Sequence, residues 1–138
     1  TGGDPSEWGG VEIYDWPLRN EQESRLLSLD HDVWLDSTVY DDGEFIITST
    51  KGFLASINQQ GKIIRRFQGH SRHVLCVTIA ADMLISGSDD ASIRVWDAKS
   101  GNHLRTLRQH TSEVRDLAVG PTQDGTLTVA SAGADKTV

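Results

Sequence analysis

The sequence predicts an all-β fold made of a small antiparallel sheet that recurs along the chain. The clearest copy lies in residues 69–107 and contains four runs of strand-forming residues, 74–79, 83–87, 92–96 and 103–107. The third run alternates apolar and polar residues, and short polar clusters separate all four runs, which is the pattern of strands joined by tight turns. These observations indicate one four-stranded sheet per copy.

The same unit recurs at intervals of about 40 residues, the spacing of a repeat architecture. His110 lies 40 residues after His70, and His31 lies 39 residues before it. Asp135 repeats Asp90 once a five-residue insertion in the preceding hairpin is allowed for. The chain is therefore predicted to be a series of similar sheets.

The order of residues within the clearest copy is specific. It opens with a Gly-His pair at 69–70, continues through Val74, the run 84–88 and Asp90, and closes on Ile-Arg-Val-Trp-Asp at 93–97. In this order the unit resembles a WD repeat, the blade of a β-propeller. The resemblance implies a WD-repeat propeller fold in which each copy forms one blade.

The repeat divides the chain into five segments. We expect a flexible lead-in at 1–9, the end of a first blade at 10–30, a degenerate second blade at 31–68, a well-matched third blade at 69–108 and a truncated fourth blade at 109–138.

A chain of 138 residues could also form one ordinary domain with its own core. At roughly 40 residues per blade, however, it holds two whole blades and parts of two more, whereas propellers usually close with about four to eight. An open arc would leave the apolar flanks of its end blades uncovered. We therefore expect about three to four blades or part-blades that belong to a larger closed propeller.

The resemblance implies a structural role for four polar residues of the third blade, His70, Ser86, Asp90 and Trp96. In the WD-repeat pattern the indole N–H donates to the Ser hydroxyl, the Ser donates to one His nitrogen, and the other His nitrogen donates to the Asp carboxylate. Four polar groups can then be buried without an unpaired donor or acceptor. The fourth blade should repeat this network with His110, Ser131 and Asp135.

His70, Ser86 and Asp90 also contain the residue types of a hydrolase triad. An intrinsic hydrolase would need a solvent-accessible Ser86 and an oxyanion site, and the sequence has no Gly-x-Ser-x-Gly elbow. We therefore interpret these residues as structural and predict that the chain is not an enzyme and has no catalytic residue.

The spacing His70-x-x-His73-x-x-Cys76 is similar to that of a metal-ligand set. The resemblance assigns His70 to the network and Cys76 to an inner strand, so the three side chains should not converge on one ion. Cys76 is interpreted as a small core residue because it lies in an apolar run. The sequence has neither a Gly-rich phosphate loop nor a calcium loop, and we predict no metal and no cofactor.

The formal charge of −7 is uneven, because residues 1–68 carry six Lys and Arg against twelve Asp and Glu, and residues 69–138 carry seven against eight. No basic field is present, so direct binding of nucleic acid is not expected. Cations do occur on the predicted fourth strands, the outer edges of the blades, where positive charge discourages edge-to-edge pairing. These cations are Lys62, Arg65, Arg66, Arg105 and Arg108.

The single Cys excludes an internal disulfide. The sequence has no N-glycosylation acceptor, no signal peptide and no long apolar run. We expect an intracellular protein, cytoplasmic or nuclear, without a membrane partner.

The resemblance places partner binding on the blade-top face, formed by the loops into the first strand and between the second and third strands. Apolar residues beside charges are typical of such a surface. With Leu35 taken as the match of Val74, the candidate residues are Trp34, Asp36, His73, Leu75, Asp89, Glu113, Arg115 and Ala134.

We therefore predict a non-catalytic scaffold for protein–protein interaction, with other proteins or peptides docking at the blade-top face. The alternative is the sensor or substrate-recruiting propeller region of a larger multidomain enzyme, such as a kinase, a ubiquitin ligase or an NTPase.

Overall fold

The computed structural model describes residues 10–13, 25–28, 34–41, 43–120 and 125–138. The predicted lead-in at 1–9 and His31 lie outside the described residues.

The described residues form twelve strands in four antiparallel sheets, which confirms the all-β prediction. The first sheet pairs β1 (Gly10–Ile13) with β2 (Arg25–Ser28). The second has the order β3 (Trp34–Asp41), β4 (Glu44–Ser49), β5 (Leu54–Asn58) and β6 (Ile63–Arg66). The third has the order β7 (Val74–Ala80), β8 (Met83–Ser88), β9 (Ile93–Asp97) and β10 (His103–Leu107). The fourth pairs β11 (Val114–Val119) with β12 (Val129–Gly133).

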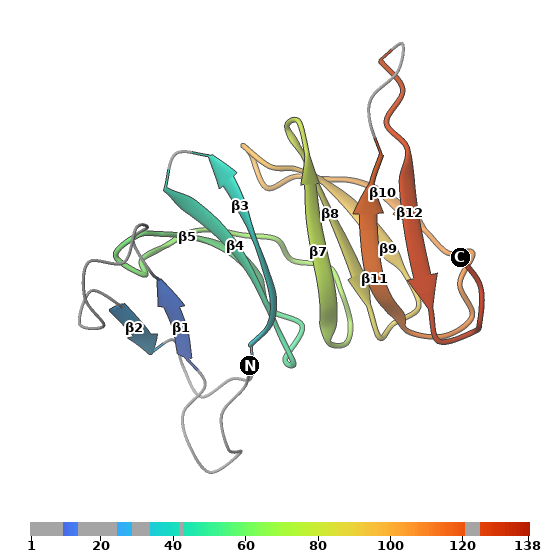
Figure 1. The fold of residues 1–138 in the computed structure, drawn as a ribbon, viewed down its shortest axis with the longest axis horizontal. Coiled ribbons are helices and arrows are strands. Elements are labelled where there is room, and N and C mark those ends of the chain that lie inside the picture. Colours follow the sequence, from blue (N-terminus) through green and yellow to red (C-terminus); the bar gives the residue numbers. More distant parts are fainter. Residues whose placement is uncertain (1–9, 14–24, 29–33, 42, 121–124) are drawn as a thin grey trace.

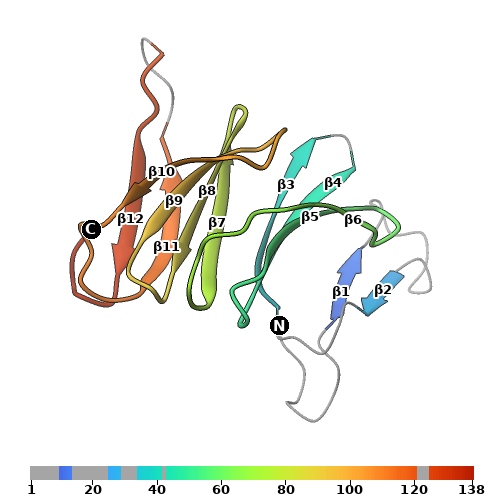
Figure 2. The same ribbon diagram turned by 180° about the vertical axis from the view of Figure 1, so that it is seen from behind.

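The sheets follow one another in chain order along an arc (Figure 1). The first strands of the last three sheets, β3, β7 and β11, lie side by side along the inside of the arc. The last strands of the two complete sheets, β6 and β10, lie at the opposite edge and are in the foreground when the molecule is seen from behind (Figure 2). This is the arrangement expected for consecutive propeller blades.

Apolar side chains fill the spaces between neighbouring sheets. Ile46 and Leu54 of the second sheet pack with Val77, Leu84 and Trp96 of the third, and all five are buried. Full burial of one such side chain stabilises the fold by about 1.5–3 kcal/mol relative to its exposure. Face-to-face burial between sheets is thus the main apolar core of the molecule.

The third and fourth sheets approach each other closely at Gly87. A Cβ atom at this position would lie 2.6 Å from Cys76 Sγ and 2.7 Å from Val114 Cγ1. Glycine is needed here because any side chain would separate the two sheets.

The pairing register corrects the sequence alignment of β3. Each inner strand has a register shift near its start, between Trp34 and Asp36 in β3 and between Val74 and Cys76 in β7. Trp34 pairs with the last residue of β4 as Val74 pairs with the last residue of β8, so Trp34, and not Leu35, is the match of Val74. The prediction was wrong by one residue because a bulge adds a residue to one strand without leaving a clear mark in the sequence.

Arg65 on the outer strand β6 makes contacts that its position at a blade edge did not predict. Its side chain is 22% exposed, and the guanidinium donates to Glu44 Oε1 at 3.0 Å. It also donates to the carbonyl oxygen of Ala98 in the third sheet at 2.9 Å. Arg65 therefore ties the second sheet to the third, since its long side chain reaches across the junction between them.

Candidate functional site

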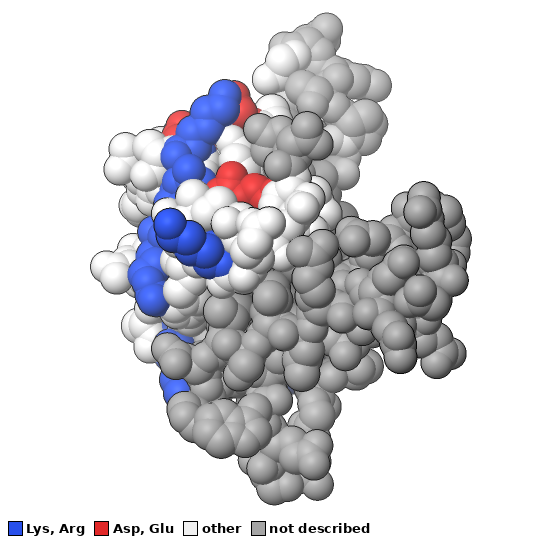
Figure 3. Space-filling model, turned by 90° about the vertical axis from the view of Figure 1, so that its left-hand side faces the viewer, with Lys and Arg blue, Asp and Glu red and all other residues white. Residues whose placement is uncertain are grey.

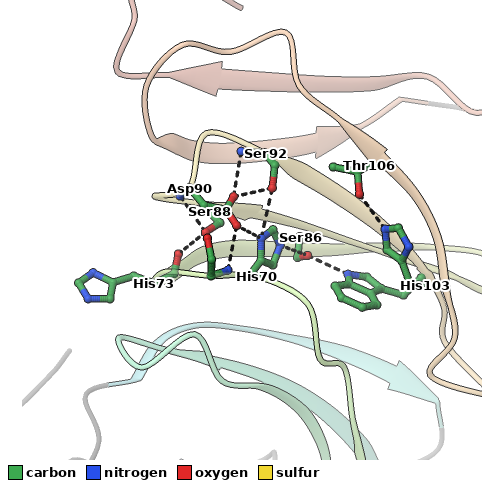
Figure 4. Close-up of polar contacts among 10 residues, drawn as sticks. His70, His73, Ser86, Ser88, Asp90, Ser92, His103 and Thr106 are labelled. Carbon is green, nitrogen blue, oxygen red and sulfur yellow. Dashed lines mark hydrogen bonds and ion pairs between the residues drawn. The ribbon is translucent and has the colours of Figure 1, made fainter.

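Four polar residues of the third sheet form a continuous chain of hydrogen bonds (Figure 4). Trp96 Nε1 donates to Ser86 Oγ at 2.9 Å. Ser86 Oγ lies 2.8 Å from His70 Nε2, and His70 Nδ1 lies 3.0 Å from Asp90 Oδ2. The segment before β7, the strand β8, the turn after it and the strand β9 each supply one member, so the chain of bonds ties the segment before the first strand to the second and third strands.

The direction of donation determines the protonation of His70. Ser86 has one hydroxyl proton to give to Nε2, so Nδ1 carries the proton donated to Asp90. Burial lowers the pKa of His70 below its ordinary value, despite the opposing effect of Asp90, and this keeps the ring neutral. Burial alone would raise the pKa of Asp90, but donors from Ser92, His70 and Ser71 outweigh it and hold that pKa well below its usual range. The neutral ring and the carboxylate are thus both satisfied.

A second set of residues repeats this geometry in the fourth sheet. His110 Nε2 lies 2.8 Å from Ser131 Oγ, and His110 Nδ1 lies 3.0 Å from Asp135 Oδ2. Hydrogen bonds from Thr137 and Thr111 lower the pKa of Asp135. The structure brings together these three residues, as it does the four of the third sheet.

The geometry does not suit a hydrolase, because Ser86 is fully buried and its hydroxyl is held between Trp96 and His70. A nucleophile must reach its substrate. No substrate can contact this hydroxyl in the folded chain.

The three residues with metal-like spacing do not come together. His70 belongs to the network, the His73 side chain is 51% exposed beside Asp89, and Cys76 is buried. Burial raises the pKa of the Cys76 thiol to about 12, which leaves it protonated and unreactive. Across the described ranges, no group of three or more His, Cys, Asp and Glu residues is placed to hold a metal ion.

The residue just before β7 and the β8–β9 turn form one rim of the third sheet. The backbone N–H of Asp89 donates to the carbonyl of His73 at 3.0 Å, and their side chains approach to 3.6 Å. The fourth sheet has the same arrangement, in which the N–H of Ala134 donates to the carbonyl of Glu113 at 2.9 Å. These four predicted residues therefore lie together in pairs at equivalent places, which we call the loop rim.

The bulge near the start of each inner strand adds three more residues to the loop rim. The bulged residues are Leu35, Leu75 and Arg115. Leu35 is 39% exposed, Leu75 is half-buried, and the Arg115 side chain is 64% exposed and paired with Glu113 at 3.0 Å. Sequence reasoning named Leu75 and Arg115 but missed Leu35, which only the register identifies.

Asp36 has a different place from the one predicted. Its Oδ1 accepts the N–H of Ser37 at 2.8 Å, and its Oδ2 accepts the N–H of Val77 in the next sheet at 2.9 Å. The register places Asp36 opposite Thr48, at the position that Cys76 holds in the third sheet. Both oxygens of Asp36 therefore serve backbone groups, and the residue is not part of the loop rim.

Basic side chains gather along one margin of the described surface (Figure 3). The exposed cations on or beside the outer strands are Lys62, Arg66, Arg105 and Arg108. Arg66 also lies over the ring of Phe53, 4.5 Å from its centroid. This margin is separate from the loop rim, because it follows the last strands of the sheets and the rim follows the first.

In the part of the chain that the structure describes, no helix has the length and hydropathy needed to cross a membrane.

Comparison with known proteins shows the family. The WD domain, G-beta repeat family matches residues 61–97 and 101–138, more than half of the chain. The chain therefore belongs to this family, and the predicted WD-repeat resemblance is confirmed.

Individual relatives are more distant. WD repeat-containing protein 55 of Mus musculus is 27% identical over 131 residues, which are 91% of this chain and 34% of that protein. The probable E3 ubiquitin ligase complex SCF subunit sconB of Aspergillus clavatus is 30% identical over 76 residues, 48% of this chain and 11% of that protein. This chain thus spans about a third or less of the length of these relatives.

The fold is similar to that of solved propellers. The crystal structure of the WD40 beta propeller domain of Doa1 superposes with a TM-score of 0.69 and 23% identity, over 81% of this chain and 38% of that one. The likeness confirms the predicted fold class, a set of consecutive WD-repeat blades.

Proposed function

We propose that this chain is a non-catalytic scaffold that binds proteins or peptides at its loop rim. The observation that carries the proposal is the row of bulged residues, Leu35, Leu75 and Arg115, on three inner strands that lie side by side. Among the residues that the structure describes, none of the three belongs to the apolar clusters between the sheets or to the networks around His70 and His110. Side chains that are not needed for packing between the sheets are available to a partner.

The backbone of the loop rim is held in place before any partner arrives. The bonds from Asp89 to His73 and from Ala134 to Glu113 join each turn to the segment before the inner strand. Little conformational entropy is then lost on binding, which favours affinity. Rigid presentation of short loops is the mechanism we propose.

The composition of the loop rim suits a protein partner. Two partly exposed leucines lie in a row with an arginine, and His73, Asp89 and Glu113 flank them. Apolar anchors surrounded by polar residues are typical of protein interfaces. We expect a peptide with an apolar residue at its centre to fit this row.

A peptide-display library selected on the purified chain tests the proposal. The selected peptides are then titrated against Leu35→Ala, Leu75→Ala and Arg115→Ala, with Arg66→Ala and Arg108→Ala on the basic margin as matched controls. Each rim substitution should cost about 2 kcal/mol of binding free energy if it removes a central contact, roughly a thirtyfold loss of affinity. The margin substitutions should alter mainly the salt dependence of binding. Full affinity in all rim variants together with loss in the margin variants would overturn the proposal.

A second candidate function is substrate recruitment within a multidomain enzyme. It is favoured by the name of one relative, a probable subunit of an E3 ubiquitin ligase complex. In this case ubiquitin-ligase subunits should co-purify with the protein at fixed stoichiometry, and substitutions in the loop rim should remove a substrate without removing those subunits. A scaffold of the simpler kind would co-purify with no ligase subunit.

A further inference from the structure

Two half-buried arginines at the junction of the second and third sheets differ in their partners. Arg65 donates to Glu44 Oε1 at 3.0 Å and to the carbonyl oxygen of Ala98 at 2.9 Å. The side chain of Arg94 on β9 makes no hydrogen bond or ion pair with any residue that the structure describes, and its Nε is buried without an acceptor. Buried charges in folded proteins are normally paired. Arg94 therefore has donors that the described part of the chain does not use.

Two neighbours hold the guanidinium of Arg94 in place. Side chains two residues apart share one face of a strand, so Arg94 lies on the same face of β9 as Trp96, and its Cζ is 6.0 Å from the centroid of that ring. Gly69 borders the guanidinium as well. A Cβ atom at Gly69 would collide with Arg94 Nη1 and would lie 3.0 Å from Trp96 Cη2. The cation is thus positioned before any ligand arrives, in a space that a glycine leaves open.

The fold does not require an arginine at this place. Arg94 pairs with Ser86 of the neighbouring strand, and Ala55 of the second sheet pairs with Ile47 at the equivalent position. Ala55 is 0% exposed, so a methyl group fills the same place there. A sheet of this kind forms with either residue, and Arg94 is available for a role other than folding.

The surface around Arg94 is open to a ligand, and we call it the outer corner. It consists of Arg94, the exposed residues 68–69, and Leu104 and Thr106 on β10. Thr106 pairs with Arg94 across the two strands, and Leu104, two residues earlier, is 55% exposed. The bordering segments, 67–69 and 103–109, contain arginines but no acidic residue. The outer corner therefore combines an unpaired cation with an exposed apolar side chain.

From these observations we infer that the outer corner is a second binding site, for an acidic segment of a partner protein in which a Glu or Asp adjoins an apolar residue. The carboxylate would accept two parallel hydrogen bonds from the guanidinium of Arg94, the strongest pairing that an arginine makes. The apolar neighbour would pack on Leu104. This site is separate from the loop rim, because β9 and β10 are third and fourth strands and the rim follows the first.

Charge and backbone favour a carboxylate on a protein over other anions. One half-buried guanidinium matches the single charge of a carboxylate, whereas a phosphate group with nearly two charges is typically bound by a cluster of arginines. A lipid surface is disfavoured because β10 pairs with β9 alone in the described ranges, which leaves one edge of its backbone unpaired. Hydrocarbon cannot satisfy such groups, whereas water or a peptide can.

A subtractive peptide selection on the full chain provides the first test. A displayed random library is depleted on Arg94→Ala and then selected on the wild-type chain, so that the recovered peptides need Arg94. They should contain Glu or Asp beside an apolar residue, and changing that acid to its amide should lower affinity by at least about tenfold. Urea denaturation checks that Arg94→Ala folds. If it does not, Arg94→Lys replaces it, since lysine keeps the charge without the planar fork. Recovery of no peptide, or only of peptides without an acid, would overturn the inference.

Titration of the recovered peptides against further variants locates the site. Leu104→Ala should weaken binding by at least about threefold, and Leu75→Ala in the loop rim should change it by less than about twofold. The opposite pattern would place these peptides on the loop rim and reject the outer corner. Absence of binding at the outer corner would leave the loop-rim proposal untouched, because peptides for the rim are selected without depletion on Arg94→Ala.

Two competitors test the class of partner. The first is the same peptide with phosphoserine in place of its acid, and the second is a vesicle of phosphatidylcholine with phosphatidylserine. Both should bind the chain at least about tenfold more weakly than the acidic peptide. Equal or tighter binding of either competitor to the wild-type chain, lost in Arg94→Ala, would overturn the assignment to an acidic protein segment.

Discussion

The carboxylate of Asp36 on β3 accepts the backbone N–H of Val77 on β7 at 2.9 Å, across the junction of two sheets. In the second and fourth sheets the equivalent N–H groups belong to Ser37 and Leu117. Each donates to the side chain of the aspartate that directly precedes it in the sequence. The third sheet has Cys76 at that place, and a thiol cannot accept in the same way. The neighbouring sheet therefore supplies the acceptor that the third sheet lacks.

Asp36→Ala should destabilise the fold more than Asp116→Ala. The first substitution leaves two N–H groups without their acceptor, one of them on buried Val77, and should cost about 2 kcal/mol or more. The second removes one bond to an exposed group and should cost under about 1 kcal/mol. Urea denaturation of both variants measures the difference. Equal losses would show that the cross-sheet bond adds nothing to stability.

The networks around His70 and His110 should contribute to stability and not to catalysis. Asp90→Ala leaves His70 and the nearby backbone donors without an acceptor, and should lower the free energy of unfolding by about 1–3 kcal/mol. His70→Ala should have a similar effect, because the buried Ser86 hydroxyl then has no acceptor and Asp90 loses one of its donors. Thermal and denaturant melts check this, with an esterase assay on the same samples. Unchanged melts together with loss of a hydrolytic activity would reverse the interpretation.

Acidification should weaken the fold in two stages. The pKa of His70 is lowered in the folded chain, so its contribution is full above the unfolded value of about 6.5 and is lost as the pH falls below it. The pKa of Asp90 is also lowered, so its contribution is full above about pH 3.9 and is lost at more acid pH. Urea unfolding from pH 7 to pH 3 should show both stages. His70→Gln should remove the first, and a parallel decline in both proteins would assign that stage to other groups.

Ala91→Gly should stabilise the β8–β9 turn. Ala91 has a φ of 61°, a left-handed conformation that costs an L-residue roughly 1 kcal/mol. Glycine removes that cost, although its greater freedom in the unfolded chain offsets part of the gain. We expect an increase of up to about 1 kcal/mol in the free energy of unfolding. The control is Ala80→Gly within β7, which should lose about 0.5–1 kcal/mol. A loss in both variants would refute the argument from φ.

Arg65→Ala should loosen the junction between the second and third sheets. The substitution removes bonds to Glu44 and to the carbonyl of Ala98. Because the side chain is largely buried, we expect a loss of about 1.5–3 kcal/mol, against less than about 0.5 kcal/mol for exposed Arg108→Ala. Hydrogen exchange at the backbone amides of β6 and of residues 98–102 would locate the effect. Unchanged exchange there would place any loss of stability elsewhere.

The sequence by itself determined the strands and the polar network. Alternation of apolar and polar residues is local, so the four strands of the third sheet begin or end within about one residue of their predicted bounds. His70, Ser86, Asp90 and Trp96 could be linked in advance because their types and spacing match the WD repeat. Information of this kind is contained in short stretches of chain.

Tertiary structure alone decided which side chains meet at the junctions between sheets. The bulge in β3 exchanges the places of Trp34 and Leu35, and a pattern of period two contains no signal of an added residue. In the sequence, Arg65 and Asp36 are indistinguishable from ordinary surface charges. In the structure, Arg65 donates to the carbonyl of Ala98 and Asp36 accepts the N–H of Val77, and both of these groups belong to another sheet. Such pairings depend on how two sheets pack, because an unsatisfied N–H or carbonyl appears only after the backbone is buried, and the nearest suitable side chain can then come from any part of the chain.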